Sequence, residues 1–128
     1  MGSFISAVTL TVPDYDQAID FYVGVLGFDL LEDTKLSDTK RWVKIAPKGA
    51  QTALVIAQAE GASQIAAVGN QNGGRVSFFL QTDDFISRYE TMRNADVTFT
   101  EEPRRESYGH VVVFSDPFGN LWDLIQPI

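Results

Sequence analysis

Several residue types and segments are scarce in this chain, and each absence excludes a class of function. No cysteine is present, which excludes disulfide bonds, thiolate catalysis and cysteine-ligated zinc. The single histidine leaves no histidine pair to share a metal ion. No apolar run approaches the ~18 residues of a membrane-spanning helix, and the N-terminus lacks a signal-peptide pattern. We therefore expect a cytoplasmic protein without a membrane partner.

Basic residues are also few. Ten Lys and Arg stand against 17 Asp and Glu, a formal net charge of -7. Nucleic acid and anionic membranes attract basic surfaces, so neither is an expected partner. A glycine-rich phosphate loop and a Gly-x-Ser-x-Gly nucleophile turn are both missing. An acidic chain does attract cationic ligands, which agrees with a cation-binding function but fits many other functions as well.

The 128 residues are sufficient for one domain with a real hydrophobic core. Period-2 alternation of apolar residues predicts strands, and a 3.6-residue period behind an Asp cap predicts helices. The first half reads as strand 5–12, a helix capped by Asp14 and running to about residue 26, and strands 28–34, 41–46 and 52–57. The second half reads as strand 75–82, a helix capped by Asp83 and stopping near Asn94, and strands 97–101, 109–115 and 121–126.

The same order of predicted elements thus occurs twice. One strand-helix-strand-strand-strand unit covers residues 4–58, and a second covers 74–128. The connector 59–73 contains a possible short helix at 62–68. Because neither half-sheet can bury both its faces alone, two curved half-sheets closing around a shared cavity are the economical solution. The predicted fold class is α+β, two tandem βαβββ modules in a single domain.

The turn Asp116-Pro117-Phe118-Gly119 carries the most information. Asp at the first position, Pro at the second and Gly at the fourth are typical of a tight reversal between antiparallel strands. The turn leads into an apolar strand that contains Asp123. A carboxylate is costly in a packed core, so a pocket is its natural place.

These residues resemble the vicinal oxygen chelate superfamily, which includes glyoxalase I, bleomycin-resistance proteins and extradiol dioxygenases. The resemblance rests on Val8 to Tyr22 (VTLTVPDYDQAIDFY), on Leu26-Gly27-Phe28, and on Asp116 to Asn120 (DPFGN). It implies a paired βαβββ architecture and usually a homodimer. It leaves the chemistry open, because the superfamily holds both enzymes and binding proteins.

The resemblance also implies positions for four metal ligands, on the first and last strands of each repeat. In this sequence they fall on Ala7, Val55, Ser77 and Asp123, of which only Asp123 binds divalent ions well. A slip of one residue at the fourth strand, or of two at the fifth, where Arg75 would replace Ser77, supplies no further ligand. We therefore predict no metal at the family position and no other cofactor.

Two residues are candidates for catalysis. Asp123 could anchor a cationic group or act as a general base, or it could be a solvated carboxylate paired with Arg75. His110 could act as acid or base near neutral pH, most plausibly if it faced Asp123; the plainer alternative is a structural or exposed histidine.

Several residues could line a ligand-binding cleft. Trp42 offers a stacking wall for an aromatic or cationic ligand, or else belongs to the core or a dimer interface. Arg75 could hold an anionic group or simply neutralise an acid. The cavity-side positions of the first and fifth strands add Thr9, Ser77 and Phe79.

The sequence thus favours a metal-free, homodimeric binding protein that holds a small aromatic or partly cationic molecule in such a cleft. One alternative is a divergent metal-dependent lyase, isomerase or dioxygenase of the same superfamily. A metal-free catalyst that uses Asp123 and His110 is another. The last is a dimer module whose cavity is filled by its own side chains.

Overall fold

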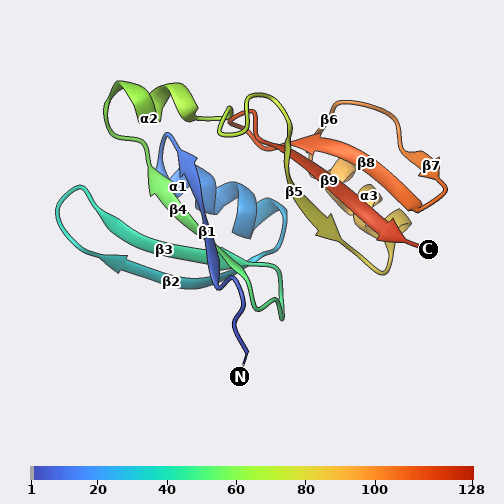
Figure 1. Cartoon of the computed structure of the whole chain (residues 1–128), viewed down its shortest axis with the longest axis horizontal. Helices are drawn as coiled ribbons and strands as arrows, with labels where there is room; N and C mark the ends of the chain where they lie inside the picture. The colour runs from blue at the N-terminus through green and yellow to red at the C-terminus, as the bar shows by residue number, and fades with distance from the viewer. Residues whose placement is uncertain (1) are drawn as a thin grey trace. The chain divides into compact units, whose positions relative to one another are not determined.

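Two compact units make up the structure, a computed structural model that describes residues 2–128. The first unit ends at Val68 and the second begins at Gly69, inside the predicted connector. Each unit has one curved sheet and few helices, which confirms the α+β prediction (Figure 1). Both sheets are open, with free edges, rather than closed into barrels.

In the first unit the sheet has the strand order β1-β4-β3-β2. Strands β1 and β4 run parallel, and the other pairs are antiparallel. The chain order is β1 (Ala7–Val12), α1 (Tyr15–Ile19), η1 (Asp20–Val25), β2 (Asp29–Lys35), β3 (Arg41–Ala46), β4 (Ala53–Gln58) and α2 (Gly61–Ala67). All the predicted elements are present, with ends shifted by one or two residues.

The first helix begins and ends where the sequence indicates. The Asp14 carboxylate accepts a hydrogen bond from the backbone N–H of Gln17 at 2.9 Å, which caps α1. The helix continues into η1, a π-helical segment that closes with the Leu26 N–H donating to the Phe21 carbonyl. Gly27 follows at φ 76°, the left-handed conformation expected of a helix stop.

The second unit has the strand order β5-β9-β8-β6, with β7 also paired to β8. Its elements are β5 (Val76–Gln81), α3 (Phe85–Asn94), β6 (Thr98–Phe99), β7 (Arg104–Glu106), β8 (Gly109–Ser115) and β9 (Leu121–Pro127). Strands β5 and β9 are parallel, and β8 and β9 are antiparallel.

Helix α3 ends at Asn94, as predicted, and the left-handed residue that follows is Asp96, at φ 63°. Two details of the second unit differ from the prediction. The α3 cap is Asp84, whose carboxylate accepts from the Ser87 N–H, and not Asp83. The predicted strand 97–101 shortens to β6, and pairing with β8 resumes as the unpredicted β7. Pro103, which has no N–H to donate, lies in the break between them.

Each unit covers only one face of its sheet with a helix. In the first, α1 packs against β4 over the buried side chains of Leu10, Val43 and Ile56. In the second, α3 packs against β9 over buried Phe114 and Leu124. The opposite faces carry mainly half-buried and exposed side chains, although Ala46, Ala53 and Val111 are buried there. Helix α2 buries none of its residues. Within residues 2–128 no helix is long and apolar enough to cross a membrane.

The turn between β8 and β9 has the predicted geometry. Gly119 lies at φ 100°, and its N–H donates to the Asp116 carbonyl. The buried Asp116 carboxylate accepts from the N–H groups of Phe118 and Asn120, at 2.9 and 2.8 Å, and from the Asn120 side-chain amide at 2.7 Å. The turn is therefore closed by hydrogen bonds to the Asp116 carboxylate, which an apolar side chain could not accept.

Replacing Asp116 by Ala should lower the free energy of unfolding by about 2–4 kcal/mol, because buried N–H groups lose a charged acceptor. Equilibrium unfolding in urea measures this loss. Asp38→Ala is the matched control, since Asp38 lies in the exposed β2–β3 turn and only meets Lys35 at 3.7 Å. That change should cost less than about 0.5 kcal/mol. Equal losses in the two variants would contradict this account of the turn.

Candidate functional site

The uncovered face of the first sheet carries a row of four residues across its strands. The pairing register places Thr9 beside Val55, Val55 beside Lys44, and Lys44 beside Glu32. Trp42 lies two residues from Lys44 on β3 and shares this face. We call these five residues the first open face. Two of its residues, Thr9 and Trp42, were predicted to line a ligand-binding cleft. Its two charged residues, Lys44 and Glu32, were not predicted to do so.

A cavity of about 330 Å³ adjoins this face where β3 and β4 approach α2. Trp42, Val55 and Ala57 line it from the sheet, and Gln64 lines it from α2. Its remaining lining includes Tyr15, Leu36, Lys40, Arg41, Gln58 and Glu60. Trp42 is 39% exposed, so its ring is accessible to a bound molecule rather than buried in the core. This size and mixed lining suit a small aromatic compound.

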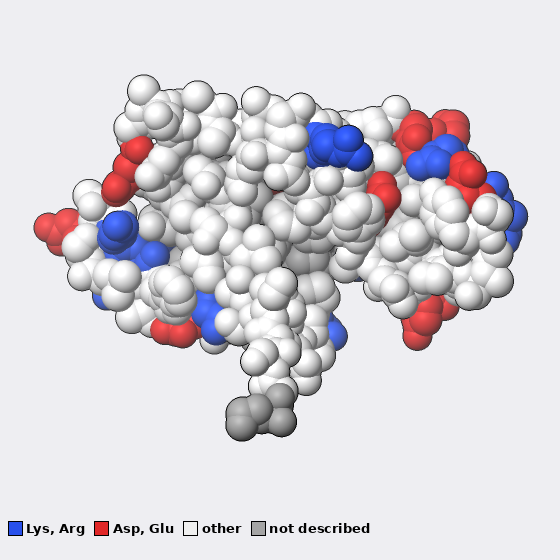
Figure 2. All heavy atoms as spheres, in the orientation of Figure 1, with Lys and Arg blue, Asp and Glu red and all other residues white. Residues whose placement is uncertain are grey.

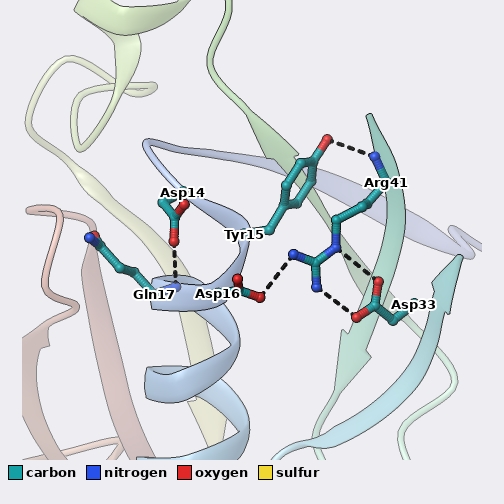
Figure 3. A network of polar contacts seen from close by, with 6 residues as sticks. All are labelled: Asp14, Tyr15, Asp16, Gln17, Asp33 and Arg41. Carbon is teal, nitrogen blue, oxygen red and sulfur yellow. Dashed lines mark hydrogen bonds and ion pairs between the residues drawn. The ribbon is translucent and has the colours of Figure 1, made fainter. Parts of the chain in front are cut away.

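A network around Arg41 fixes the beginning of β3 beside this cavity (Figure 3). The Arg41 guanidinium donates to both carboxylate oxygens of Asp33, at 3.1 and 2.7 Å, and to Asp16 of α1 at 2.8 Å. It also stacks over the Tyr15 ring at 5.1 Å. The Tyr15 hydroxyl accepts from the Arg41 backbone N–H at 3.2 Å. With Arg41 held against the helix, the alternation of β3 directs Trp42 to the open face.

The electrostatics of this network are those of a strong ion pair. Hydrogen bonding to Arg41 holds the pKa of Asp33 below its ordinary value. The same contacts, first with Asp33 and then with Asp16, raise the pKa of Arg41. Sequence reasoning missed the network, although one signal was available. Arg41 has the parity of Val43 and Ile45, whose side chains face α1.

The uncovered face of the second sheet brings Phe79 and Asp123 together. They are direct register partners on β5 and β9, and Val113 of β8 lies on the other side of Asp123. Phe79 is 67% exposed, and Asp123 is half-buried. We call these three residues the second open face.

The other two candidates on β5 are placed less regularly. The register of β5 with β9 shifts between Val76 and Phe78, so Ser77 lies at an irregularity of the ladder. Its hydroxyl accepts a hydrogen bond from the Asn72 side chain at 3.1 Å. Arg75 is exposed and lies just before the strand.

The electrostatic partners of Asp123 are not those considered from the sequence. Its pKa is raised above 3.8, chiefly because burial disfavours the charged form. The Arg104 guanidinium opposes this rise, and the Glu101 carboxylate adds to it. Arg104 donates to Glu101 at 2.9 Å and to Glu106 at 2.8 Å. No ion pair joins Asp123 to Arg75 within residues 2–128.

Acidic and basic groups gather side by side near β7 on the face shown in Figure 2, where no large patch of one sign is visible. The Arg104 pKa is raised, first by its hydrogen bond to Glu101 and then by that to Glu106. The Glu101 carboxylate also accepts from the Val113 N–H at 3.2 Å. This side chain therefore ties the β6–β7 connection to the strand beside Asp123.

His110 lies on the other side of the second sheet from Asp123. It stacks on Phe85 of α3 with ring centroids 4.0 Å apart, on the face that the helix covers. Asp123 pairs with Val113, three residues further along β8, and alternation places the two side chains on opposite faces. His110 and Asp123 therefore do not form an acid–base pair within this unit, because their side chains lie on opposite faces of the sheet.

The four positions at which the superfamily places metal ligands hold one strong donor. Ala7 and Val55 have no donor atom in their side chains, and the Ser77 hydroxyl is engaged by Asn72. Within residues 2–128 no three His, Cys, Asp or Glu side chains come together. The residues present do not fit a metal ion, since such sites need about three protein ligands.

The paired βαβββ modules define a class of protein. A family model described as the Glyoxalase/Bleomycin resistance protein/Dioxygenase superfamily matches residues 4–124, so the chain belongs to that superfamily. This confirms the resemblance stated from the sequence.

Individual relatives refine this placement. An uncharacterized protein of Shewanella frigidimarina (strain NCIMB 400) is 47% identical, and the alignment covers 98% of this chain and 95% of that protein. The solved structure of TnmS3, an antibiotic binding protein from Streptomyces sp. CB03234, is 32% identical with a TM-score of 0.80, covering 98% and 97% of the two chains. A glyoxalase/bleomycin resistance protein from the same Streptomyces is 31% identical with a TM-score of 0.74, covering 96% and 100%.

The Asp123→Asn variant should be more stable than the wild type near neutral pH, by less than about 1 kcal/mol because the carboxyl is partly solvated. A raised native pKa means that the folded chain keeps its proton to higher pH than the unfolded chain. Wild-type stability is therefore lost as pH rises from 3.8 through the native pKa, whereas Asn does not titrate. Urea unfolding between about pH 3 and 7 measures the difference. A difference that is absent at every pH would contradict the burial of this group.

Proposed function

We propose that this chain is a small-molecule-binding protein that holds an aromatic ligand against Trp42. The observation that carries the proposal is the cavity of about 330 Å³ beside this partly exposed ring. A packed core would bury Trp42, as Trp122 is buried at 3% exposure between Phe78 and Phe114. The likeness to TnmS3, described as an antibiotic binding protein, supports the same class of function. Thr9 contributes a small polar group to the same face, on β1, with β4 between it and the strand of Trp42.

The second open face extends the proposal to ligands with a cationic group. Asp123 offers a carboxylate, and the exposed Phe79 offers an aromatic surface directly beside it. A cation placed there would be attracted both by the carboxylate and by the face of the ring. Ser77 and Arg75 stand at the beginning of the same strand, where they could contact polar parts of a ligand.

We further propose that the protein works without a metal ion and as a homodimer. The donor set at the family positions argues against the alternative of a metal-dependent lyase, isomerase or dioxygenase. Several large apolar side chains near the N-terminus and on β2 are exposed, a pattern that favours burial against a second copy. They are Phe4, Ile5, Val8, Leu30 and Leu31.

Isothermal titration with 2-naphthamide, an uncharged two-ring probe, tests the binding role of Trp42. Trp42→Ala should weaken binding about tenfold, because it removes a stacking surface worth roughly 1–2 kcal/mol. Trp122→Phe is the matched control, since the buried Trp122 cannot touch a ligand. It should lower the melting temperature and leave the dissociation constant unchanged. No detectable binding by the wild type, or equal binding by the Trp42→Ala variant, would overturn the proposal.

Native mass spectrometry tests the metal-free and dimeric proposals together. The expected species has a mass of about 28 kDa, two chains of 14.2 kDa, with no bound ion after incubation with zinc, nickel, manganese or ferrous iron. A stoichiometric bound ion would favour the metal-dependent enzyme instead. A mass of one chain at micromolar concentration would contradict the dimer and leave the binding proposal to the titration.

A further inference from the structure

Lys44 occupies the middle of the first open face. It is half-buried on a central strand, with Val55 on one side and Glu32 on the other. Within residues 2–128 its ammonium group has no hydrogen bond or ion pair. A half-buried cation on a central strand, between apolar side chains such as Val55 and Trp42, is costly unless it receives a partner.

The other cations of this unit are paired with carboxylates or lie outside the strands. Arg41 is held by Asp33 and Asp16 on the helix-covered side. Lys48 pairs with Asp29 at 2.8 Å beyond the end of β3, and Lys35 meets Asp38 at 3.7 Å. Lys40 is exposed just before β3, where it lines the Trp42 cavity. Lys44 is the half-buried cation that shares the open face of β3 with Trp42.

Glu32 is the acidic group nearest in register to Lys44, and it could have neutralised the ammonium. It is exposed, it accepts a hydrogen bond from the Thr34 hydroxyl at 3.1 Å, and no ion pair joins it to Lys44. A bulge in β2 between Leu30 and Glu32 shifts the register at this point. Glu32 thus lies beside Lys44 in the sheet but forms no ion pair with it.

We propose that Lys44 binds the carboxylate of an aromatic acid whose ring stacks on Trp42. The two residues are separated by one position on β3, so their side chains leave the same face about 6–7 Å apart. This spacing allows a fused two-ring system to lie on Trp42 while a carboxylate on its edge receives a hydrogen bond from the flexible Lys44 side chain. The inference rests on the proposed function of Trp42 and adds the charge of the ligand to it.

Three probes with the same ring and different charge test this preference. They are 2-naphthoate, 2-naphthamide and 2-naphthylmethylammonium, each titrated calorimetrically into the whole chain. The wild type should bind 2-naphthoate about tenfold more tightly than the amide, because a charge-assisted hydrogen bond replaces a neutral one. The ammonium probe should bind no better than the amide in the Trp42 cavity.

Substitutions then assign the preference to its residue. Lys44→Gln should abolish the tenfold difference between 2-naphthoate and the amide, and Lys44→Arg should retain it. Lys40→Gln removes the exposed lysine that lines the cavity, and Lys48→Gln removes the same charge outside the face; both should leave the difference intact. Glu32→Gln should strengthen 2-naphthoate binding, because the competing carboxylate beside Lys44 is gone.

The outcomes separate this inference from the function on which it rests. Equal binding of all three probes by the wild type, weakened in each case by Trp42→Ala, would overturn the role of Lys44 and leave the binding function standing. A preference for 2-naphthoate that survives Lys44→Gln would also overturn it. Failure of every probe to bind the wild type would overturn both the role of Lys44 and the binding function.

Discussion

A single short helix can cover only one face of a four- or five-stranded sheet, and this constraint shapes both units. In the first, α1 and η1 bury the side chains of Leu10, Val43 and Ile56. In the second, α3 buries Phe114 and Leu124. Because side chains alternate along a strand, the residues between these must point to the uncovered face. The open faces are thus a direct consequence of how little helix each repeat contains (Figure 1).

Charged side chains fix the positions of strand ends that the packing of apolar side chains does not determine. Arg41 ties β3 to β2 and α1 through Asp33 and Asp16, and Asp116 closes the turn that leads into β9. Both are ionised groups with several hydrogen bonds, the arrangement in which a polar contact contributes most to stability. Their positions matter for the site, because Trp42 follows Arg41 directly and Asp123 lies on the strand after the turn.

The chain has the superfamily fold, and the positions at which the superfamily places metal ligands hold one strong donor, Asp123. Side chains without donor atoms stand at two of the four family positions, and the remaining carboxylate is left with an aromatic neighbour, Phe79. The half-buried charged residue is a cation, Lys44, on the first open face and a carboxylate, Asp123, on the second. Fold membership therefore says little about function in this chain, because function depends on the individual side chains of the open faces.

Local patterns in the sequence were sufficient to predict the order of the strands and helices other than β7, the turn at Asp116, and the parity that places Trp42 and Asp123 away from the helices. These features depend on residues within a few positions of one another. Tertiary structure alone decided which charges meet. The contacts of Arg41 with Asp16, of Arg104 near Asp123, and of His110 with Phe85 join elements far apart in the chain. Strand register and helix docking set these contacts, and no local periodicity encodes them.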